Sequence, residues 1–411
     1  MNAPDVACRL CGSHTLIAVL TLGQQPLANQ LVDTAGAAVA AKRFPLEVAF
    51  CPDCALLQIT ESVPPQDLFS DYLYFSSFSE TMLRHAETIV EQLIRTRQLT
   101  AQHRVVEIAS NDGYLLQYYR QHNIPVLGIE PAANVAAAAR SERDIETLCE
   151  FFTADLAKKL AADGLCADVI HANNVLAHVP DLNGFADGLY TLLKPHGVAV
   201  IEVPYVKDLM DGCEFDTIYH EHLSYFALTP LNEMFSRHGL SIVDVEHLSM
   251  HGGSLRLFVQ RKETATPNSS AAELLERERG WGVGEIGTYR AFAERVEASR
   301  NDLCALLNRC RAEGKRVAAY GAAAKGSTLL NYYGIGSDTI EFVADRSHHK
   351  QGKFMPGTGV PIVGPEALLE SKPDYVLLLV WNFAEEVLRQ QQTYRDGGGK
   401  FILPIPKLRI V

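Results

Sequence analysis

No run of apolar residues in this sequence approaches the ~18 to 20 residues that a membrane-spanning helix needs. The beginning of the chain lacks a basic region followed by an apolar stretch, so secretion is not predicted and a cytoplasmic location is expected. Low-complexity tracts and short tandem repeats are also missing, and therefore no repeat architecture is predicted.

The chain also lacks an excess of positive charge. It contains 37 Lys and Arg against 49 Asp and Glu, and its net charge of -12 disfavours a broad surface for nucleic acid or anionic membrane. With 47% hydrophobic and 21% charged residues it is an ordinary globular protein, and its 411 residues predict two or three domains. The sequence does not define the oligomeric state, and a monomer is compatible with it.

Cysteine is scarce, but four of the nine cysteines form two Cys-x-x-Cys knuckles, Cys8 with Cys11 and Cys51 with Cys54. Two such knuckles complete a tetrahedral, structural Zn²⁺ site, whereas a redox pair would need only one. Residues 1–75 contain three Lys and Arg against seven Asp and Glu, which argues against a zinc module that binds nucleic acid. The other cysteines are expected to be small buried hydrophobes: Cys149, Cys166, Cys213, Cys304 and Cys310.

Residues 103–131 have the pattern of a buried strand, a turn of small residues, a helix and a second strand that ends in an acid. The turn from Ser110 to Gly113 exposes amides of a helix N-terminus, and Glu130 stands where an acid accepts hydrogen bonds from ribose hydroxyls. The pattern predicts half of a nucleoside-binding site, although any βαβ unit with a polar turn would share it.

A Rossmann fingerprint for NAD would require Gly-x-Gly-x-x-Gly, but Ala109, Asn111 and Gly113 occupy alternate positions after Glu107. This is closer to the Glu/Asp-x-Gly-x-Gly-x-Gly loop of S-adenosylmethionine (SAM) methyltransferases. Asn adopts positive φ more readily than most residues with a side chain, so Asn111 fits the loop. About twenty residues after Glu130, an acid and an apolar residue are expected against the adenine. The expected cofactor residues are Glu107, Ala109, Ser110, Asn111, Asp112, Gly113, Tyr114, Glu130, Pro131, Glu150, Phe151 and Asn173.

Strand and helix patterns alternate beyond this unit, with further strands from Ala167 and from Val198, and predict a doubly wound parallel sheet. After a polar linker at 264–270, three more strand patterns separated by helices predict a second Rossmann-like sheet. We therefore expect an α/β protein in three parts: a zinc-binding module at 1–75, a class I SAM methyltransferase domain at 76–264 and a Rossmann-like domain at 265–411.

Two histidines, a carboxylate and two tyrosines crowd into the segment from Tyr219 to Tyr225. Acid-base chemistry is the favoured interpretation, because a histidine near neutral pH can remove a proton while a carboxylate sets its tautomer. Metal binding by His220 and His222 is a weaker alternative, since no third ligand stands at an obvious spacing. A polar corner that only anchors a loop is the structural alternative.

Several motifs together resemble the SAM-dependent C-methyltransferases that act on nucleotide-linked ketodeoxysugars in antibiotic and polysaccharide pathways, of the tetronitrose C-3'-methyltransferase type. The resemblance covers nearly the whole chain. Beside the knuckles, it rests on Gln25-Pro-Leu-Ala-Asn29, Tyr72-Leu-Tyr-Phe-Ser-Ser77, Val106-Glu-Ile-Ala-Ser-Asn-Asp-Gly113, His178-Val-Pro180, Ile218-Tyr-His-Glu-His222, His251-Gly-Gly-Ser254 and Tyr320-Gly-Ala-Ala-Ala-Lys-Gly326.

This resemblance implies that His222 is the base, with Tyr219, Glu221 and His178 around it and either Tyr72 or Tyr74 in the site. A ketone beside the acceptor carbon, with C3 expected, would let His222 form an enolate that attacks the methyl of SAM. Tyr219 and His178 would donate to the enolate oxygen, and Glu221 would orient a histidine. The chain departs from its relatives at Ala109, where Gly is usual, and at His220, which could share the role of base.

The stretch from Gly321 to Thr328 resembles a phosphate loop but fails the P-loop pattern, because Lys325 precedes the second glycine, so ATP hydrolysis is not predicted. It either cradles the pyrophosphate of a nucleotide sugar or merely caps a helix near Ser327. The expected substrate-binding residues are Ser254, Lys325, Ser327, Thr328 and Asn382.

Two other functions remain compatible with these motifs. O- or N-methylation would use the same SAM loop, and a non-catalytic protein could bind SAM and a nucleotide sugar. The sequence leaves open the nucleotide, the sugar, the methylated carbon, the presence of an amine on the sugar, and the choice between His220 and His222 as the base.

Overall fold

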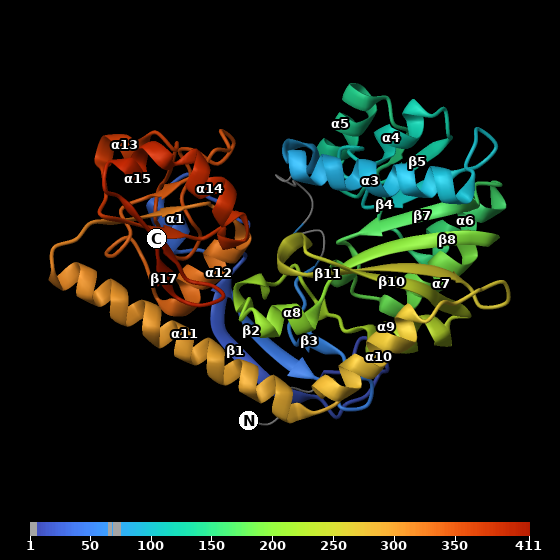
Figure 1. The fold of residues 1–411 in the computed structure, drawn as a ribbon, viewed down its shortest axis with the longest axis horizontal. Helices are drawn as coiled ribbons and strands as arrows, with labels where there is room; N and C mark the ends of the chain where they lie inside the picture. The colour runs from blue at the N-terminus through green and yellow to red at the C-terminus, as the bar shows by residue number, and fades with distance from the viewer. Residues whose placement is uncertain (1–5, 65–67, 69–74) are drawn as a thin grey trace.

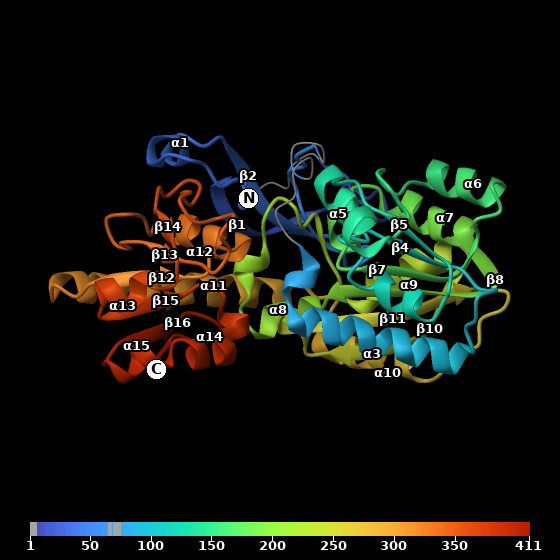
Figure 2. The ribbon, with the colours of Figure 1, turned by 90° about the horizontal axis from the view of Figure 1, so that it is seen from above.

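The computed structural model describes residues 6–64, 68 and 75–411, which form three sheets (Figure 1). A small antiparallel sheet lies between a central α/β unit and a C-terminal α/β unit (Figures 1 and 2). The predicted fold class, with two doubly wound sheets and an N-terminal zinc module, is confirmed. Within the described ranges, no helix combines the length and the apolar character needed to cross a bilayer.

The antiparallel sheet has the order β1-β2-β3-β9. Its strands are β1 (Ile17–Pro26), β2 (Arg43–Phe50), β3 (Leu57–Ile59) and β9 (Ser224–Tyr225), and the short helix α1 (Ala35–Val39) lies between β1 and β2. Strand β9 comes from a distant part of the chain and pairs Tyr225 with Leu57. The zinc module therefore contains a strand that belongs, in sequence, to the central unit.

The central sheet has the order β10-β11-β8-β7-β4-β5-β6, with β11 antiparallel to both of its neighbours. Its strands are β4 (Val105–Ile108), β5 (Val126–Ile129), β6 (Thr147–Leu148), β7 (Ala167–Asn173), β8 (Leu193–Pro204), β10 (Leu240–Leu248) and β11 (Ser254–Arg261). Every residue of β4 is buried, as expected for a central parallel strand.

Helices cover both faces of this sheet (Figures 1 and 2). One face carries α3 (Glu80–Arg97), α4 (Leu116–Gln121) and α5 (Ala133–Arg143), and the other carries α6 (Ala154–Ala162), α7 (Leu182–Leu192) and α9 (Leu228–Arg237). The remaining elements of this unit are η1 (Ser76–Phe78), η2 (Leu176–His178), α8 (Val206–Asp211), η3 (Phe215–Thr217) and η4 (Met250–Gly252).

Two helices, α10 (Ser270–Trp281) and α11 (Ile286–Ala312), connect the central and C-terminal units. The 27 residues of α11 span about 40 Å along the lower edge of the molecule in Figure 1. Near its start, Tyr289 stacks on Phe50 of the zinc module with ring centroids 4.3 Å apart. The helix therefore packs on the zinc module at one end and leads into the C-terminal sheet at the other.

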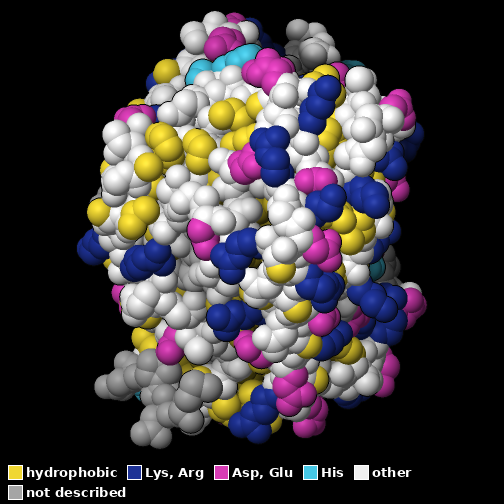
Figure 3. Space-filling model, turned by 90° about the vertical axis from the view of Figure 1, so that its left-hand side faces the viewer, with side chains coloured by type: hydrophobic (Ala, Val, Ile, Leu, Met, Phe, Trp, Pro, Cys, Tyr) yellow, Lys and Arg dark blue, Asp and Glu magenta, His cyan; other side chains and the backbone are white. Residues whose placement is uncertain are grey.

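The C-terminal sheet has the order β14-β13-β12-β15-β16-β17 and is parallel except for its last strand. Three of its strands were predicted, whereas β14, β16 and β17 are too short or too weakly patterned to be recognised. The side of the molecule where the C-terminal unit lies, at the left of Figure 1, carries interspersed basic and acidic side chains (Figure 3). The elements are β12 (Val317–Tyr320), α12 (Ala324–Tyr333), β13 (Val343–Ala344), β14 (Ile362–Val363), α13 (Ala367–Ser371), β15 (Tyr375–Leu378), η5 (Trp381–Phe383), α14 (Ala384–Gln390), α15 (Gln392–Asp396), β16 (Lys400–Leu403) and β17 (Arg409–Ile410).

Candidate functional site

A cavity of about 930 Å³ lies where the three sheets meet, a volume suited to a sizeable ligand. Its wall combines the segment 27–31 of the zinc module, the carboxyl ends of β4, β5, β7 and β8, and the loop 322–325 of the C-terminal unit. Ligands of open α/β sheets bind at such strand ends. The arrangement therefore brings both predicted nucleoside-type loops to one space.

Most of the predicted site residues line this cavity. They are Ala109, Asn111, Tyr114, Glu130, Pro131, Phe151, Asn173, His178, Tyr219, Glu221, His222, Lys325 and Asn382. The other predicted residues that the structure describes lie behind or beside the wall: Glu107, Ser110, Asp112, Gly113, Glu150, Ser254, Ser327 and Thr328. Tyr72 and Tyr74 fall outside the described residues.

The turn after β4 has positive φ at alternate positions, as Asn111 and Gly113 favour, and Ala109 adopts the same conformation although alanine does not favour it. Ala109, Asn111 and Gly113 all have positive φ, of 54°, 50° and 78°. The Glu130 carboxylate accepts hydrogen bonds from the amides of Asn111 (3.0 Å) and Ala132 (2.9 Å). These bonds tie the end of β5 to the turn and hold the carboxylate at the cavity wall.

Two acids behind the turn support it instead of lining the cavity. Asp112 accepts a hydrogen bond from the Ser77 hydroxyl, and its Oδ2 atom lies 3.5 Å from Arg143 Nη1. Burial, together with the charges of Asp112 and Glu130, raises the pKa of Glu107 well above its ordinary value. A neutral Glu107 at the end of β4 avoids the cost of a buried charge.

Of the two residues expected to contact an adenine, Phe151 lies in the cavity wall and Glu150 lies at the protein surface. Phe151 and Phe152 both line the cavity, and Phe152 packs edge-on against Phe185 with centroids 5.3 Å apart. Glu150 is exposed and does not line the cavity. The aromatic pair thus forms this side of the wall.

Hydrogen bonds define the tautomer of His222. Its Nδ1 atom lies 2.8 Å from the carbonyl oxygen of Thr217, and its Nε2 atom lies 3.0 Å from the Tyr219 hydroxyl. A carbonyl oxygen can only accept, so Nδ1 carries the proton and Nε2 presents a lone pair. Because the carbonyl of Thr217 orients the ring, it takes the role that was expected for Glu221.

The structure separates the two histidines of the segment. His220 is 1% exposed, donates from Nε2 to the carbonyl of Pro45 at 3.1 Å, and does not line the cavity. His178 faces His222 inside the cavity with ring centroids 4.8 Å apart, and burial lowers the pKa of His178 to about 4. His222 and a neutral His178 are therefore placed for chemistry, whereas His220 anchors the loop to β2.

Glu221 is held by the zinc module. It is 5% exposed and accepts a hydrogen bond of 2.7 Å from Asn29 Nδ2, 192 residues away in sequence. Burial raises the pKa of Glu221 to about 7, so both of its protonation states are accessible near neutral pH. Asn29 belongs to a recognised motif, Gln25-Pro-Leu-Ala-Asn29, but no role for it was predicted.

Replacing Glu221 with glutamine is expected to raise the free energy of unfolding at pH 8 by about 3 kcal/mol and to leave it unchanged at pH 4. The folded pKa of about 7 exceeds the unfolded value of about 4.3, so ionisation of Glu221 removes stability as pH rises between these values. Urea unfolding at both pH values measures the effect. The exposed Glu276→Gln serves as control, and equal stabilities of wild type and Glu221→Gln at pH 8 would contradict the prediction.

The loop after β12 presents basic groups and an uncapped helix N-terminus to the cavity. Helix α12 begins after Ala323, which makes no side-chain capping bond, so the alternative of a cap at Ser327 is wrong. Lys325 Nζ lies 3.3 Å from Asn382 Oδ1 and 4.5 Å from the centroid of the Trp381 ring. Lys350, which sequence reasoning missed, also lines the cavity and donates to the carbonyl of Ala322 at 2.8 Å.

Asp345, directly after β13, repeats the geometry of Glu130. Its carboxylate accepts from the amide of Ala322 in the preceding turn (2.7 Å) and from the amide of Ser347 two residues on (2.8 Å). Glu130 accepts from the corresponding turn amide and from the amide two residues on in the central sheet. Asp345 directly follows β13, the second strand of the C-terminal unit, and this position could have identified it in the sequence.

The four knuckle cysteines converge as predicted. Their sulfur atoms all lie within 4.8 Å of one another, with Cys8 to Cys54 and Cys11 to Cys51 each at 3.5 Å. Four thiolates and no other ligand fit a closed, structural Zn²⁺ site. Of the other cysteines, Cys213 and Cys310 are buried and Cys166 and Cys304 are half-buried, but the expectation of burial is wrong for Cys149, which is exposed at the end of β6.

Three family models match consecutive parts of this chain: a zinc binding domain at residues 8–69, a methyltransferase domain at 79–245 and a C-methyltransferase C-terminal domain at 249–406. The C-methyltransferase NovU of Streptomyces niveus is 38% identical over 409 residues, which cover 99% of this chain and 97% of that relative.

Two solved structures are similar over part of the chain. The PH0226 protein of Pyrococcus horikoshii OT3 is 14% identical and has a TM-score of 0.38, with 49% of this chain and 100% of that chain covered. The SAM-bound magnesium protoporphyrin IX methyltransferase of Synechocystis is 14% identical and has a TM-score of 0.34, with 44% of this chain and 79% of that chain covered.

Proposed function

Because this chain belongs to the C-methyltransferase family and is a SAM-dependent methyltransferase, we propose that it methylates the α-carbon, C3, of a nucleotide-linked 4-keto-deoxysugar. The observation that carries the proposal is the lone pair of His222 Nε2 in the cavity that the Glu130 turn also lines. A carbon acceptor requires removal of a proton from C–H, which a neutral, oriented imidazole provides.

His222 Nε2 takes the α-proton, and the electron pair of the broken C–H bond moves into an enolate whose negative charge rests on the ketone oxygen. Bound SAM supplies the electrophilic methyl group. The hydroxyl of Tyr219 donates to His222 Nε2 in the free protein; when the acceptor binds, it is proposed to turn to the ketone oxygen, which frees the Nε2 lone pair for the α-proton and supplies a donor to the enolate oxygen. His178, which burial keeps neutral and which faces His222 in the cavity, is proposed as a second donor through its single ring N–H.

The C-terminal unit is proposed to hold the nucleotide. Lys325, Lys350 and the uncapped N-terminus of α12 offer charge and amides to a diphosphate, and Asn382 adds an amide beside Lys325. Asp345 stands where an acid receives sugar hydroxyls in a Rossmann half-site, the role that is also proposed for Glu130 toward the ribose of SAM. The sugar would then extend from this loop toward His222.

The first test is product analysis with SAM that carries a ¹³C-labelled methyl group. The purified protein is mixed with a small panel of nucleotide-linked 4-keto-deoxysugars, and the product is examined by mass spectrometry and NMR. We expect one added methyl, bonded to a ring carbon adjacent to the ketone. A methyl on oxygen or nitrogen, or no product despite SAM binding, would refute the proposal.

A further inference from the structure

Glu214 is a cavity residue to which no role has been assigned above. It lies between α8 and η3, is 7% exposed and contributes to the cavity wall. Its backbone is fixed by a hydrogen bond of 2.8 Å from its amide to the carbonyl of Leu209. Its carboxylate has no hydrogen-bond or ion-pair partner among the residues that the structure describes.

Two glycines leave room for this carboxylate. A Cβ atom at Gly252 would lie 2.4 Å from both Glu214 oxygens, and a Cβ atom at Gly212 would lie 2.9 Å from Oε1. Gly252 belongs to the His251-Gly-Gly-Ser254 motif and has a φ of 100°, which favours glycine. The backbone therefore encloses the carboxylate and leaves it in contact with the cavity.

No charged group among the described residues forms an ion pair with the Glu214 carboxylate. Burial, opposed by the charge of Lys325 and reinforced by Asp216 and Asp208, raises the pKa of Glu214 to about 8. Lys325 forms no ion pair with it and instead contacts Asn382. A buried carboxyl group without a partner is costly, so a ligand that donates a hydrogen bond here would regain that energy.

Glu214 is also coupled by backbone contacts to the proposed base. Its carbonyl accepts from the amide (3.1 Å) and from the hydroxyl (2.7 Å) of Thr217, whose own carbonyl holds His222 Nδ1. The segment that contains Glu214 and Thr217 follows β8. In the central sheet, β7 separates β8 from β4, the strand that leads into the proposed cofactor turn. Glu214 therefore lies on the segment that holds the proposed base, and the sugar ring is the part of the acceptor that this segment would meet.

We infer that Glu214 is a specificity-determining residue, whose carboxyl receives a hydrogen-bond donor, a hydroxyl or an amino group, on the sugar ring of the acceptor. The inference rests on the proposed function. A phosphate is the wrong partner, because Asp208 and Asp216 add negative charge around this position. Sugars that lack the donor leave the carboxyl group buried and unpaired, and are disfavoured for that reason.

The test compares wild type, Glu214→Gln and Glu214→Asp on three nucleotide-linked 4-ketosugars that differ at one ring position, which bears an amino group, a hydroxyl or hydrogen. Glu214→Gln keeps the shape and an oxygen that accepts a hydrogen bond, whereas Glu214→Asp withdraws the acceptor from the cavity. We expect Glu214→Asp to lower kcat/KM about 10²-fold for the donor-bearing sugar that wild type prefers and less than about 3-fold for the deoxy analogue. Glu214→Gln should keep kcat/KM within about 10-fold of wild type for both sugars, because its amide oxygen still accepts the hydrogen bond. The preferred sugar distinguishes the amine from the hydroxyl.

The exposed Glu276→Gln is the matched control, and circular dichroism with SAM titration checks that each variant folds and binds its cofactor. In Glu214→Asp, a loss that is equal for all three sugars, or no loss, would overturn the role of Glu214 while wild-type turnover upholds the proposed function. If wild type binds and converts none of the sugars, the proposed function fails and the inference fails with it.

Discussion

His222→Asn is expected to lower kcat about 10³-fold, within the range attributed to general base catalysis. The asparagine Nδ2 can still donate to the carbonyl of Thr217, as Nδ1 of His222 does at 2.8 Å, so the loop keeps its anchor. Nothing then stands at the position of Nε2 to accept the α-proton of the acceptor. Binding of SAM should change less than about 2-fold, because Asn111 and Glu130 lie on other strands.

The proton-transfer step can be measured separately from methyl transfer. With S-adenosylhomocysteine in place of SAM, wild type should exchange the α-hydrogen of the acceptor with deuterium from solvent, and His222→Asn should not. His220→Gln is the matched control, since glutamine Nε2 can replace His220 Nε2 as donor to the carbonyl of Pro45. Unchanged turnover in His222→Asn, or an equal loss in His220→Gln, would remove His222 from the role of base.

Local patterns predicted the parts of this site that are built from neighbouring residues. The turn from Ala109 to Gly113 follows its strand directly, so its composition determines which backbone angles it can adopt. The same is true of the knuckles, whose paired thiolates are set by a spacing of three residues. The alternation of strand and helix patterns predicted the two α/β sheets, because parallel strands joined by helices have few allowed arrangements, but it did not predict the antiparallel strand β11.

Contacts between distant segments could not be read in this way. Asn29 reaches Glu221 across 192 residues, and Glu214 meets Gly252 only because β11 returns beside β8. The orientation of His222, one of the two roles expected for Glu221, depends on a backbone carbonyl for this reason, and charge tuning of a histidine by Glu221 stays a prediction. Sequence proximity suggested that a carboxylate orients His222, whereas the fold uses a backbone carbonyl, which has no signature in side-chain composition.

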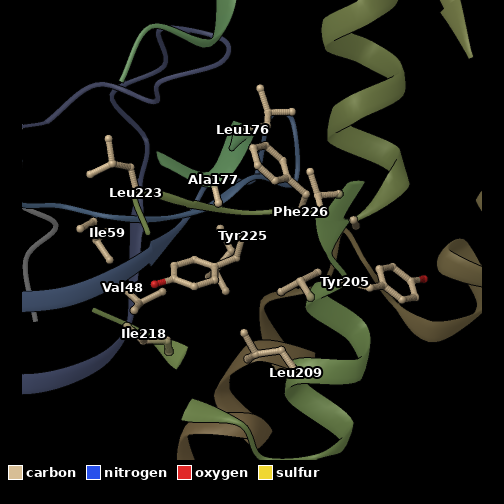
Figure 4. Packing of buried hydrophobic residues seen from close by; sticks show 14 of the residues in the cluster. Val48, Ile59, Leu176, Ala177, Tyr205, Leu209, Ile218, Leu223, Tyr225 and Phe226 are labelled. Atoms are coloured by element: carbon tan, nitrogen blue, oxygen red, sulfur yellow. The ribbon is translucent and has the colours of Figure 1, made fainter. Parts of the chain in front are cut away.

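The zinc module pairs with the segment that carries the proposed base. Strand β3 begins three residues after Cys54 and pairs with β9, and Leu223, directly after His222, accepts a hydrogen bond from the amide of Ile59 at 3.0 Å. Figure 4 shows Tyr225 of β9 among Val48, Ile59 and Ile218. The knuckles thus hold the strand on which the segment with the proposed base ends.

Loss of this metal should therefore reduce both stability and methyl transfer while leaving the cofactor turn largely intact. For Cys51→Ser, or after removal of zinc by a chelator, we expect the unfolding midpoint to fall by about 10 °C or more and kcat to fall at least about 10-fold. SAM affinity should change less than about 3-fold, since Glu130 and Asn111 contact no residue of the knuckles.

Metal content by mass spectrometry, thermal unfolding, SAM titration and turnover are measured on the same samples, with Cys166→Ser as the control thiol outside the knuckles. A zinc-free protein that keeps full turnover would show that the β2, β3 and β9 pairing alone positions His222. Equal losses of SAM affinity and turnover would instead indicate general unfolding. Only a loss of turnover that exceeds the loss of SAM affinity supports zinc as the element that positions the base, because the metal acts on β9 and not on β4.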